Sequence, residues 1–175
     1  MNSTIEVMKA LQENGADLIE LGMPYSDPLA DGPVIQNSGL VALANGMTIE
    51  TLFAQLKDAR KEINVPIILM GYMNPVLQYG FDRFCKDAAA VGVDGLILPD
   101  LPEYEFETEY GAIIKANGLD FIFLVTPETS KERIEKYIGD AERAGAKILV
   151  DGRNAKVNGK ENVTYVGPTV IDFVT

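Results

Sequence analysis

One pattern recurs along this chain: a helical stretch ends at a glycine, and a short apolar run follows almost at once. Four such junctions read ENGADLIELG, AVGVDGLILP, ANGLDFIFLV and RAGAKILVDG. Glycine commonly ends a helix because it adopts the left-handed conformation at little cost. The apolar runs are nearly continuous, as in strands that are buried on both faces of a parallel sheet. The pattern therefore predicts repeated β–α units with right-handed crossovers.

The strands and helices alternate in order, but too few units are present to close a barrel. We expect strands at 16–23, 65–72, 93–100, 119–126 and 146–152, and helices at 3–15, 34–46, 48–63, 81–92, 103–118 and 129–145. Thr48 should cap the third helix, and Thr129 or Ser130 the last. An eightfold barrel needs about 250 residues. The prediction is a single α/β domain over 1–175, either a partial (β/α) barrel of TIM type or an open doubly wound sheet. No strand leads into a G-x-G-x-x-G loop, which weakens the dinucleotide-binding alternative.

The composition narrows the classes of partner. The formal net charge is −11, so nucleic-acid binding is not expected, since it depends on lysine and arginine. A phosphorylated small molecule remains possible, because helix N-termini bind phosphate locally. No apolar run reaches 18 residues, and the first residues lack the pattern of a signal peptide. We therefore expect no membrane segment and a cytoplasmic location.

The chain has no histidine and only one cysteine, Cys85. Catalytic triads with an imidazole base and zinc sites built on His and Cys are thereby excluded. Acid–base chemistry must use carboxylates, lysine or tyrosine, and no metal or cofactor is expected. Cys85 has helical spacing with apolar residues, so we interpret it as a buried core thiol.

Glu20 is an unusual residue because it stands inside an apolar strand. Leu18, Glu20 and Gly22 share one face of that strand, and Glu20 lies near its carboxyl end, where active sites of both candidate folds are found. A carboxylate in apolar surroundings holds its proton more tightly, which suits an acid–base catalyst. A glutamate that points into solvent at a frayed strand end is an equal alternative. Asp31, in the proline-rich loop that follows, is typical of a turn or helix cap.

Three segments are similar to the tryptophan synthase alpha chain family. They read LIELGMPYSDPLADGPVIQNSG, PIILMGYMNPVLQYGFDRFCKDAAAVGVDGLILPDLPEYE and FIFLVTPETS, and the resemblance covers residues 1–130. It implies a (β/α) barrel lyase that cleaves indole-3-glycerol phosphate into indole and glyceraldehyde 3-phosphate by a retro-aldol reaction. It also implies a tryptophan synthase beta chain as partner.

The resemblance assigns roles to individual residues. Glu20 would be the general acid–base that protonates the indole ring at C3, and Asp31 would bind the indole N–H and stabilise the developing positive charge. Tyr72 and Ile97 match substrate-binding positions. The surface that meets the beta chain would include Tyr25, Asp27, Pro28, Asn74, Asp100 and Pro102.

Residues 131–175 depart from this family and resemble a segment of the aldehyde dehydrogenases, most like the methylmalonate-semialdehyde type. The loops that hold the substrate phosphate in the family have no counterpart here, and Ile148 stands near the position of a pocket tyrosine. Alternatives to a lyase are therefore a non-catalytic module that binds a beta chain and, more weakly, a dehydrogenase fragment. The strands at 17–23 and 146–150 lack closing partners, which favours self-association or an open sheet.

Overall fold

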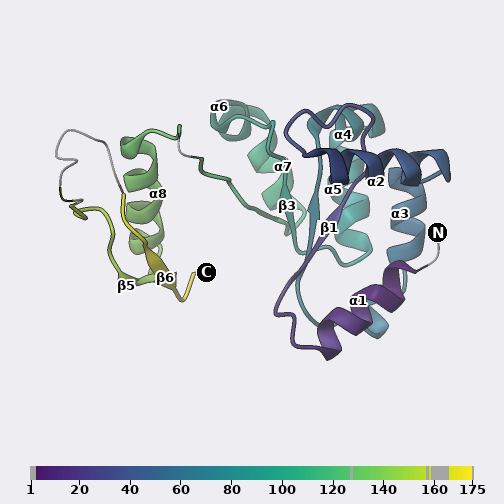
Figure 1. The fold of residues 1–175 in the computed structure, drawn as a ribbon, viewed down its shortest axis with the longest axis horizontal. Coiled ribbons are helices and arrows are strands. Elements are labelled where there is room, and N and C mark those ends of the chain that lie inside the picture. Colours follow the sequence, from purple (N-terminus) through teal and green to yellow (C-terminus); the bar gives the residue numbers. More distant parts are fainter. Residues whose placement is uncertain (1–2, 127, 157, 159–165, 175) are drawn as a thin grey trace. The chain divides into compact units, whose positions relative to one another are not determined.

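The computed structural model describes residues 3–126, 128–156, 158 and 166–174 (Figure 1). The chain divides into two compact units, residues 1–124 and residues 125–175. Each unit has its own secondary structure, and each is described separately below.

The first unit contains a four-stranded parallel sheet. Its strands are β1 (Ile19–Gly22), β2 (Ile67–Met70), β3 (Gly95–Ile97) and β4 (Asp120–Phe121), and they lie side by side in sequence order. Glu20 is level with Ile68 on β2, and Ile68 is level with Gly95 on β3. The sheet does not close within the described residues. The prediction of an α/β fold with parallel strands and an unclosed barrel is therefore confirmed.

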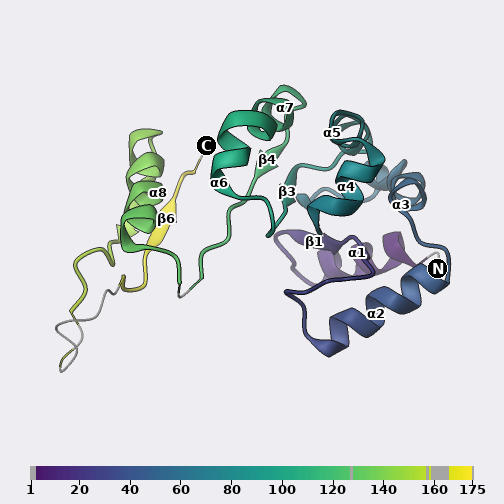
Figure 2. The same cartoon turned by 90° about the horizontal axis from the view of Figure 1, so that it is seen from above.

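The predicted helices of this unit form in the expected order, together with a helix at Met73–Tyr79 that the sequence did not indicate. They are α1 (Thr4–Glu13), α2 (Pro33–Ala44), α3 (Ile49–Leu56), the 3-10 turn η1 (Ala59–Lys61), α4 (Met73–Tyr79), α5 (Phe81–Ala90), α6 (Glu103–Glu105), the π-helical turn η2 (Phe106–Tyr110) and α7 (Gly111–Ala116). The predicted helix at 103–118 is thus the succession α6–η2–α7. Figure 2 shows α7 beside β4, with which it is in contact. The Thr48 hydroxyl accepts the Thr51 N–H (3.1 Å), as expected of the cap of α3.

The glycines that precede the strands adopt the conformation that the sequence pattern requires. Gly15, Gly92, Gly118 and Gly145 all have φ between 70° and 103°. This left-handed backbone ends the helix and turns the chain into the next strand. The recurrent junction is therefore a structural device and not a coincidence of composition.

The hydrophobic core lies on one face of the sheet. Ile19, Ile67, Leu69 and Leu96 point toward the helices and pack against buried residues of α3 and α5, among them Leu56, Phe84 and Cys85. Successive side chains alternate across a strand. Glu20, Ile68, Met70, Ile97 and Asp120 therefore lie on the opposite face, which we call the open face. None of these five residues belongs to the core cluster.

Arg60 joins the segments that lead into β2 and β3. Its guanidinium donates to the carbonyls of Gly92 (2.8 Å) and Val65 (2.8 Å) and forms an ion pair with Asp94. A carboxylate oxygen of Asp94 also accepts the Ile67 N–H at 2.7 Å. One cation thus fixes the start of two neighbouring strands at the amino end of the sheet.

The second unit consists of α8 (Lys131–Arg143), β5 (Lys147–Val150) and β6 (Val170–Asp172). Ser130 caps α8, because its hydroxyl accepts the Arg133 N–H at 3.2 Å. The expected strand at 146–152 forms as β5, but the expectation that it would be an unpartnered strand of the parallel sheet is wrong. It pairs antiparallel with β6. Antiparallel neighbours need no helical crossover between them.

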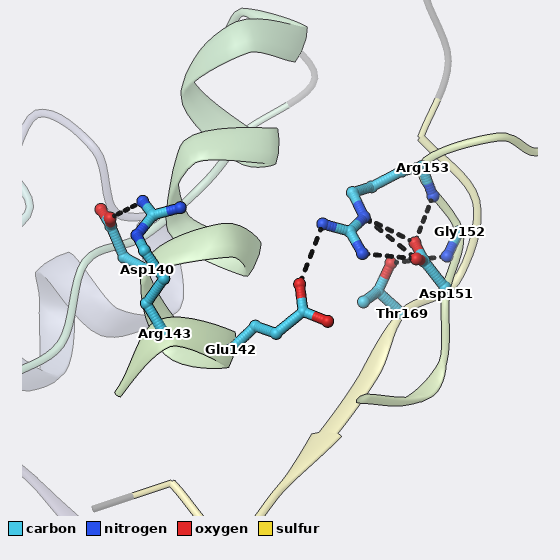
Figure 3. A network of polar contacts seen from close by, with 7 residues as sticks. All are labelled: Asp140, Glu142, Arg143, Asp151, Gly152, Arg153 and Thr169. Carbon is cyan, nitrogen blue, oxygen red and sulfur yellow. Dashed lines mark hydrogen bonds and ion pairs between the residues drawn. The ribbon is translucent and has the colours of Figure 1, made fainter. Parts of the chain in front are cut away.

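A set of contacts holds the turn after β5, and Figure 3 shows those made by Arg153. The Arg153 guanidinium donates to both carboxylate oxygens of Asp151 (2.6–3.0 Å) and lies 3.6 Å from the Glu142 carboxylate on α8. The Gly167 N–H donates to the Gly152 carbonyl at 2.8 Å. The two glycine backbones come so close that a Cβ on Gly152 would collide with the Gly167 carbonyl oxygen.

Candidate active site

Glu20 lies on the open face of β1, near the carboxyl end of the strand. The predicted face is therefore correct, because Glu20 points away from the helices. Of the two alternatives that the sequence leaves open for Glu20, the structure shows the solvent-exposed one and not the apolar enclosure. The physical reason is the strand count: in a sheet of four strands, no other strand of that sheet stands opposite Glu20 to exclude water.

Asp31 and Tyr72 are brought together from two different loops. Asp31 precedes α2 in the loop after β1, whereas Tyr72 follows β2. The Tyr72 hydroxyl donates to a carboxylate oxygen of Asp31 at 3.2 Å and accepts the Ala30 N–H at 3.1 Å. Burial, together with the negative charge of Asp31, raises the pKa of Tyr72 above its ordinary value. The hydroxyl therefore stays protonated at neutral pH and can remain a donor to Asp31.

The Asp31 loop is also held from its own helix. The Gln36 side chain donates to the Asp31 carbonyl at 2.9 Å, and the Asp31 N–H donates to the Pro28 carbonyl at 3.0 Å. Pro28 is buried, whereas the preceding Asp27 is exposed and accepts the Ser26 hydroxyl. Asp31 thus lies in a turn, as its proline-rich surroundings predict, and its carboxylate remains oriented by Tyr72.

Tyr25 connects the first loop to α4. Its ring lies 5.4 Å from the Tyr72 ring, and its hydroxyl accepts a hydrogen bond from the Asn74 amide at 2.9 Å. Two of the predicted interface residues, Tyr25 and Asn74, are therefore in direct contact. Both residues lie close to Tyr72, whose ring packs against that of Tyr25.

Asp100 has a structural partner. Both of its carboxylate oxygens accept the N–H of Met73, at 3.0 and 3.1 Å, where Met73 opens α4. Asp100, which follows β3, therefore caps the helix that follows β2. Pro102 lies at the N-terminus of α6 and is exposed. Ile97 is 6% exposed on the open face, level with Met70, which is itself level with Gly22 of β1.

A cavity of about 440 Å³ lies beside this group of residues. It is bounded by the loop Pro24–Ser26, by the end of α2 with the start of α3, and by α4, with Leu43, Met47 and Tyr79 as apolar walls. Tyr25 and Asn74 line it, but Glu20 and Asp31 do not. Sequence reasoning did not anticipate this cavity, because its walls come from three segments that are separated along the chain.

Cys85 is fully buried in the core on α5, as the sequence predicts. Burial raises the pKa of its thiol to about 12, so that it carries no charge at neutral pH. Among the described residues, no group of three or more His, Cys, Asp or Glu side chains is arranged to hold a metal ion. No helix in the same residues has the length and apolarity needed to cross a membrane.

A protein-family model described as tryptophan synthase alpha chain matches residues 1–144. The chain is 54% identical over 134 residues to the tryptophan synthase alpha chain of Flavobacterium johnsoniae, covering 77% of this chain and 53% of the relative. A second alpha chain, from Bacteroides fragilis, is 39% identical over 99% of this chain and 70% of its own length. The chain spans about half the length of most curated relatives that it matches here.

Solved structures give the same result for the fold. The tryptophan synthase alpha subunit from Legionella pneumophila superimposes with a TM-score of 0.71 and 42% identity, covering 76% of this chain and 51% of that structure. The A-subunit from Pyrococcus furiosus gives 0.72 and 41%, covering 79% and 55%. The aldehyde dehydrogenase resemblance of residues 131–175 finds no support in these comparisons, and the family model extends to the end of α8.

Proposed function

Because this chain belongs to the tryptophan synthase alpha chain family, we propose that it is a carbon–carbon lyase of tryptophan biosynthesis. Its substrate would be indole-3-glycerol phosphate, cleaved by a retro-aldol reaction into indole and glyceraldehyde 3-phosphate. Glu20 and Asp31 would be the catalytic carboxylates, and Tyr72 and Ile97 would contact the substrate. The observation that carries the proposal is the hydrogen bond between Tyr72 and Asp31, which orients a carboxylate at the carboxyl end of the sheet.

The reaction requires two proton transfers and the stabilisation of one positive charge. Protonation of the indole ring at C3 places positive charge on the ring nitrogen. Loss of the proton from the hydroxyl on the adjacent side-chain carbon then breaks the C3–carbon bond and releases an aldehyde. The Asp31 carboxylate would accept the ring N–H and stabilise the cation, and Glu20 would donate the first proton and receive the second.

The Tyr72 hydroxyl supports the role of Asp31. Since its raised pKa keeps it protonated, it can donate to one carboxylate oxygen while leaving the other lone pairs available to the indole N–H.

A second candidate is a non-catalytic module that binds a tryptophan synthase beta chain. It is favoured by the contacts among the predicted interface residues, in particular Asn74 with Tyr25 and Asp100 with the N-terminus of α4. These contacts do not depend on Glu20 or on a phosphate site. One solved relative is described as a tryptophan synthase complex from Pyrococcus furiosus, which makes a beta chain the natural probe.

We assign this function to the cytoplasm, in keeping with the single cysteine and a reducing compartment. The aldehyde dehydrogenase resemblance of residues 131–175 stays a prediction and contributes no activity to the proposal.

The test is indole release from indole-3-glycerol phosphate, with and without an added beta chain. The variants are Glu20→Gln and, as a matched control, Glu13→Gln at an exposed site on α1. We expect Glu20→Gln to lose at least about 100-fold in turnover and the control to lose none. Full activity in Glu20→Gln would overturn the lyase proposal. If the unmodified chain and both variants bind a beta chain and none of them releases indole, the second candidate is supported.

A further inference from the structure

We propose that Asp100 is a positioning residue for the Asp31 carboxylate and that it acts through Tyr72. In this arrangement the loop after β3 fixes the residue that follows β2, and the hydroxyl of that residue holds the loop after β1. The effect on catalysis rests on the proposed lyase function. The contacts themselves all lie within the first unit and involve no substrate.

Asp100 lies in a turn that is anchored in the hydrophobic core. The turn follows β3, and the Leu101 N–H donates to the Leu98 carbonyl across it at 3.0 Å. The side chains of Leu98 and Leu101 are only 2% and 5% exposed. The backbone that carries Asp100 is therefore held by packing on both sides, and its carboxylate can serve as a stable acceptor.

The backbone of Tyr72 is bonded on both sides to the segment that contains Asp100. On one side, the Gly71 N–H donates to the Ile97 carbonyl at 3.1 Å. On the other side, the Met73 N–H donates to both carboxylate oxygens of Asp100. Tyr72 is the N-cap residue of α4, but its own side chain makes no cap bond. Asp100 supplies the acceptor that this helix end lacks, so the backbone position of Tyr72 depends on it.

The Tyr72 side chain carries this support to the loop after β1. Its hydroxyl accepts the Ala30 N–H at 3.1 Å and donates to the Asp31 carboxylate at 3.2 Å. Hydrogen bonds weaken steeply when donor and acceptor move out of line. A small displacement of the Tyr72 backbone would therefore weaken both bonds and release the Asp31 carboxylate from its orientation.

The test follows amide hydrogen exchange at Ala30, whose N–H donates to the Tyr72 hydroxyl. Exchange is measured by NMR on the full chain and on the variants Asp100→Ala, Asp100→Asn, Tyr72→Phe and the double variant Asp100→Ala with Tyr72→Phe. Gln12→Ala is the matched control. Its side-chain oxygen also accepts backbone N–H groups from a distant segment, at Asn64 (2.7 Å) and Val65 (3.2 Å), but it does so at the amino end of the sheet.

We expect Asp100→Ala to speed exchange at Ala30 by at least about fivefold, the factor that corresponds to one lost hydrogen bond. Asp100→Asn should restore most of the protection, because its amide keeps one acceptor oxygen. In the Tyr72→Phe background the acceptor is already absent, so adding Asp100→Ala should change the rate by less than about twofold. The Gln12→Ala control should leave the rate unchanged.

Three results would overturn the proposal: an unchanged rate in Asp100→Ala, the same acceleration in the Tyr72→Phe background, or an equal acceleration in Gln12→Ala. Indole release adds a catalytic readout, in which Asp100→Ala should lower kcat and kcat/KM by the same factor while KM stays unchanged. Exchange needs no substrate, so it decides whether Asp100 positions the Asp31 loop even if the unmodified chain releases no indole. A chain that shows the exchange pattern without turnover would contradict the lyase function alone.

Discussion

The hydroxyl of Tyr72 lies 3.2 Å from a carboxylate oxygen of Asp31, although the two residues are 41 positions apart in the sequence. The same hydroxyl accepts the N–H of Ala30, the residue before Asp31. One side chain after β2 thus holds both the backbone and the carboxylate of the loop after β1. The loop is positioned by the sheet and not only by its own prolines.

Replacing Tyr72 by phenylalanine should therefore lower stability. The change removes both hydrogen bonds while keeping the ring, and each such bond contributes about 1 kcal/mol. We expect a loss of about 1–2 kcal/mol in the free energy of urea unfolding and faster amide exchange at Ala30. Tyr104→Phe, at an exposed position on α6, should change neither. Equal stability of the two variants would contradict the account.

Asp100 should stabilise α4 through its carboxylate. Asp100→Ala leaves the Met73 N–H without its acceptor, and loss of a helix cap costs about 1 kcal/mol. Asp100→Asn retains one acceptor oxygen, so it should recover most of the loss. Urea unfolding of the three proteins measures the difference. An alanine variant as stable as the asparagine variant would show that the cap contributes nothing.

Arg60 should not be replaceable by lysine. Its planar fork reaches the carbonyls of Gly92 and Val65 and the Asp94 carboxylate together, which an ammonium cannot do. We expect Arg60→Lys to lose about 1–3 kcal/mol of unfolding free energy. Arg83→Lys, which changes an exposed ion pair on α5, should lose less than about 1 kcal/mol. Thermal unfolding of both variants gives the comparison, and equal melting temperatures would refute it.

Cys85 should make the protein less stable at alkaline pH. Burial raises the pKa of the folded thiol from 9.0 to about 12, so its stabilising contribution is complete below pH 9 and is lost as the pH rises toward 12. The slope can reach about 1.4 kcal/mol per pH unit. Unfolding free energies between about pH 8 and 10 measure it before the tyrosines dominate. Cys85→Ala should flatten the slope in that window, and an unchanged slope would assign it to other groups.

The sequence predicted the recurring units well because their signals are local. A glycine that ends a helix and an apolar run that follows are both read within ten residues, and β1, β2 and β3 form where they indicate. The helix α4 was not anticipated, because Pro75 in its first turn resembles a loop signal, although proline is tolerated there.

Features that depend on distant partners could not be predicted in the same way. Whether Glu20 is enclosed depends on how many strands face it. The hydrogen bond between Tyr72 and Asp31 joins side chains from the loops after two different strands, β2 and β1. The predicted parallel pairing of β5 was wrong for the same reason: its actual partner, β6, lies about twenty residues further along the chain. The family resemblance proposed residues for the site, but it did not give contacts such as the one between Tyr72 and Asp31.

The close approach of Gly152 and Gly167 limits which mutations this chain can tolerate. Every amino acid other than glycine carries a Cβ, so position 152 is closed to substitution for as long as the two backbones meet. A side chain there would push the two backbones apart and weaken the second unit, whereas residues 1–124 have a core of their own. Residue 152 is therefore a position at which one substitution acts on the second unit and leaves the core of the first unit intact.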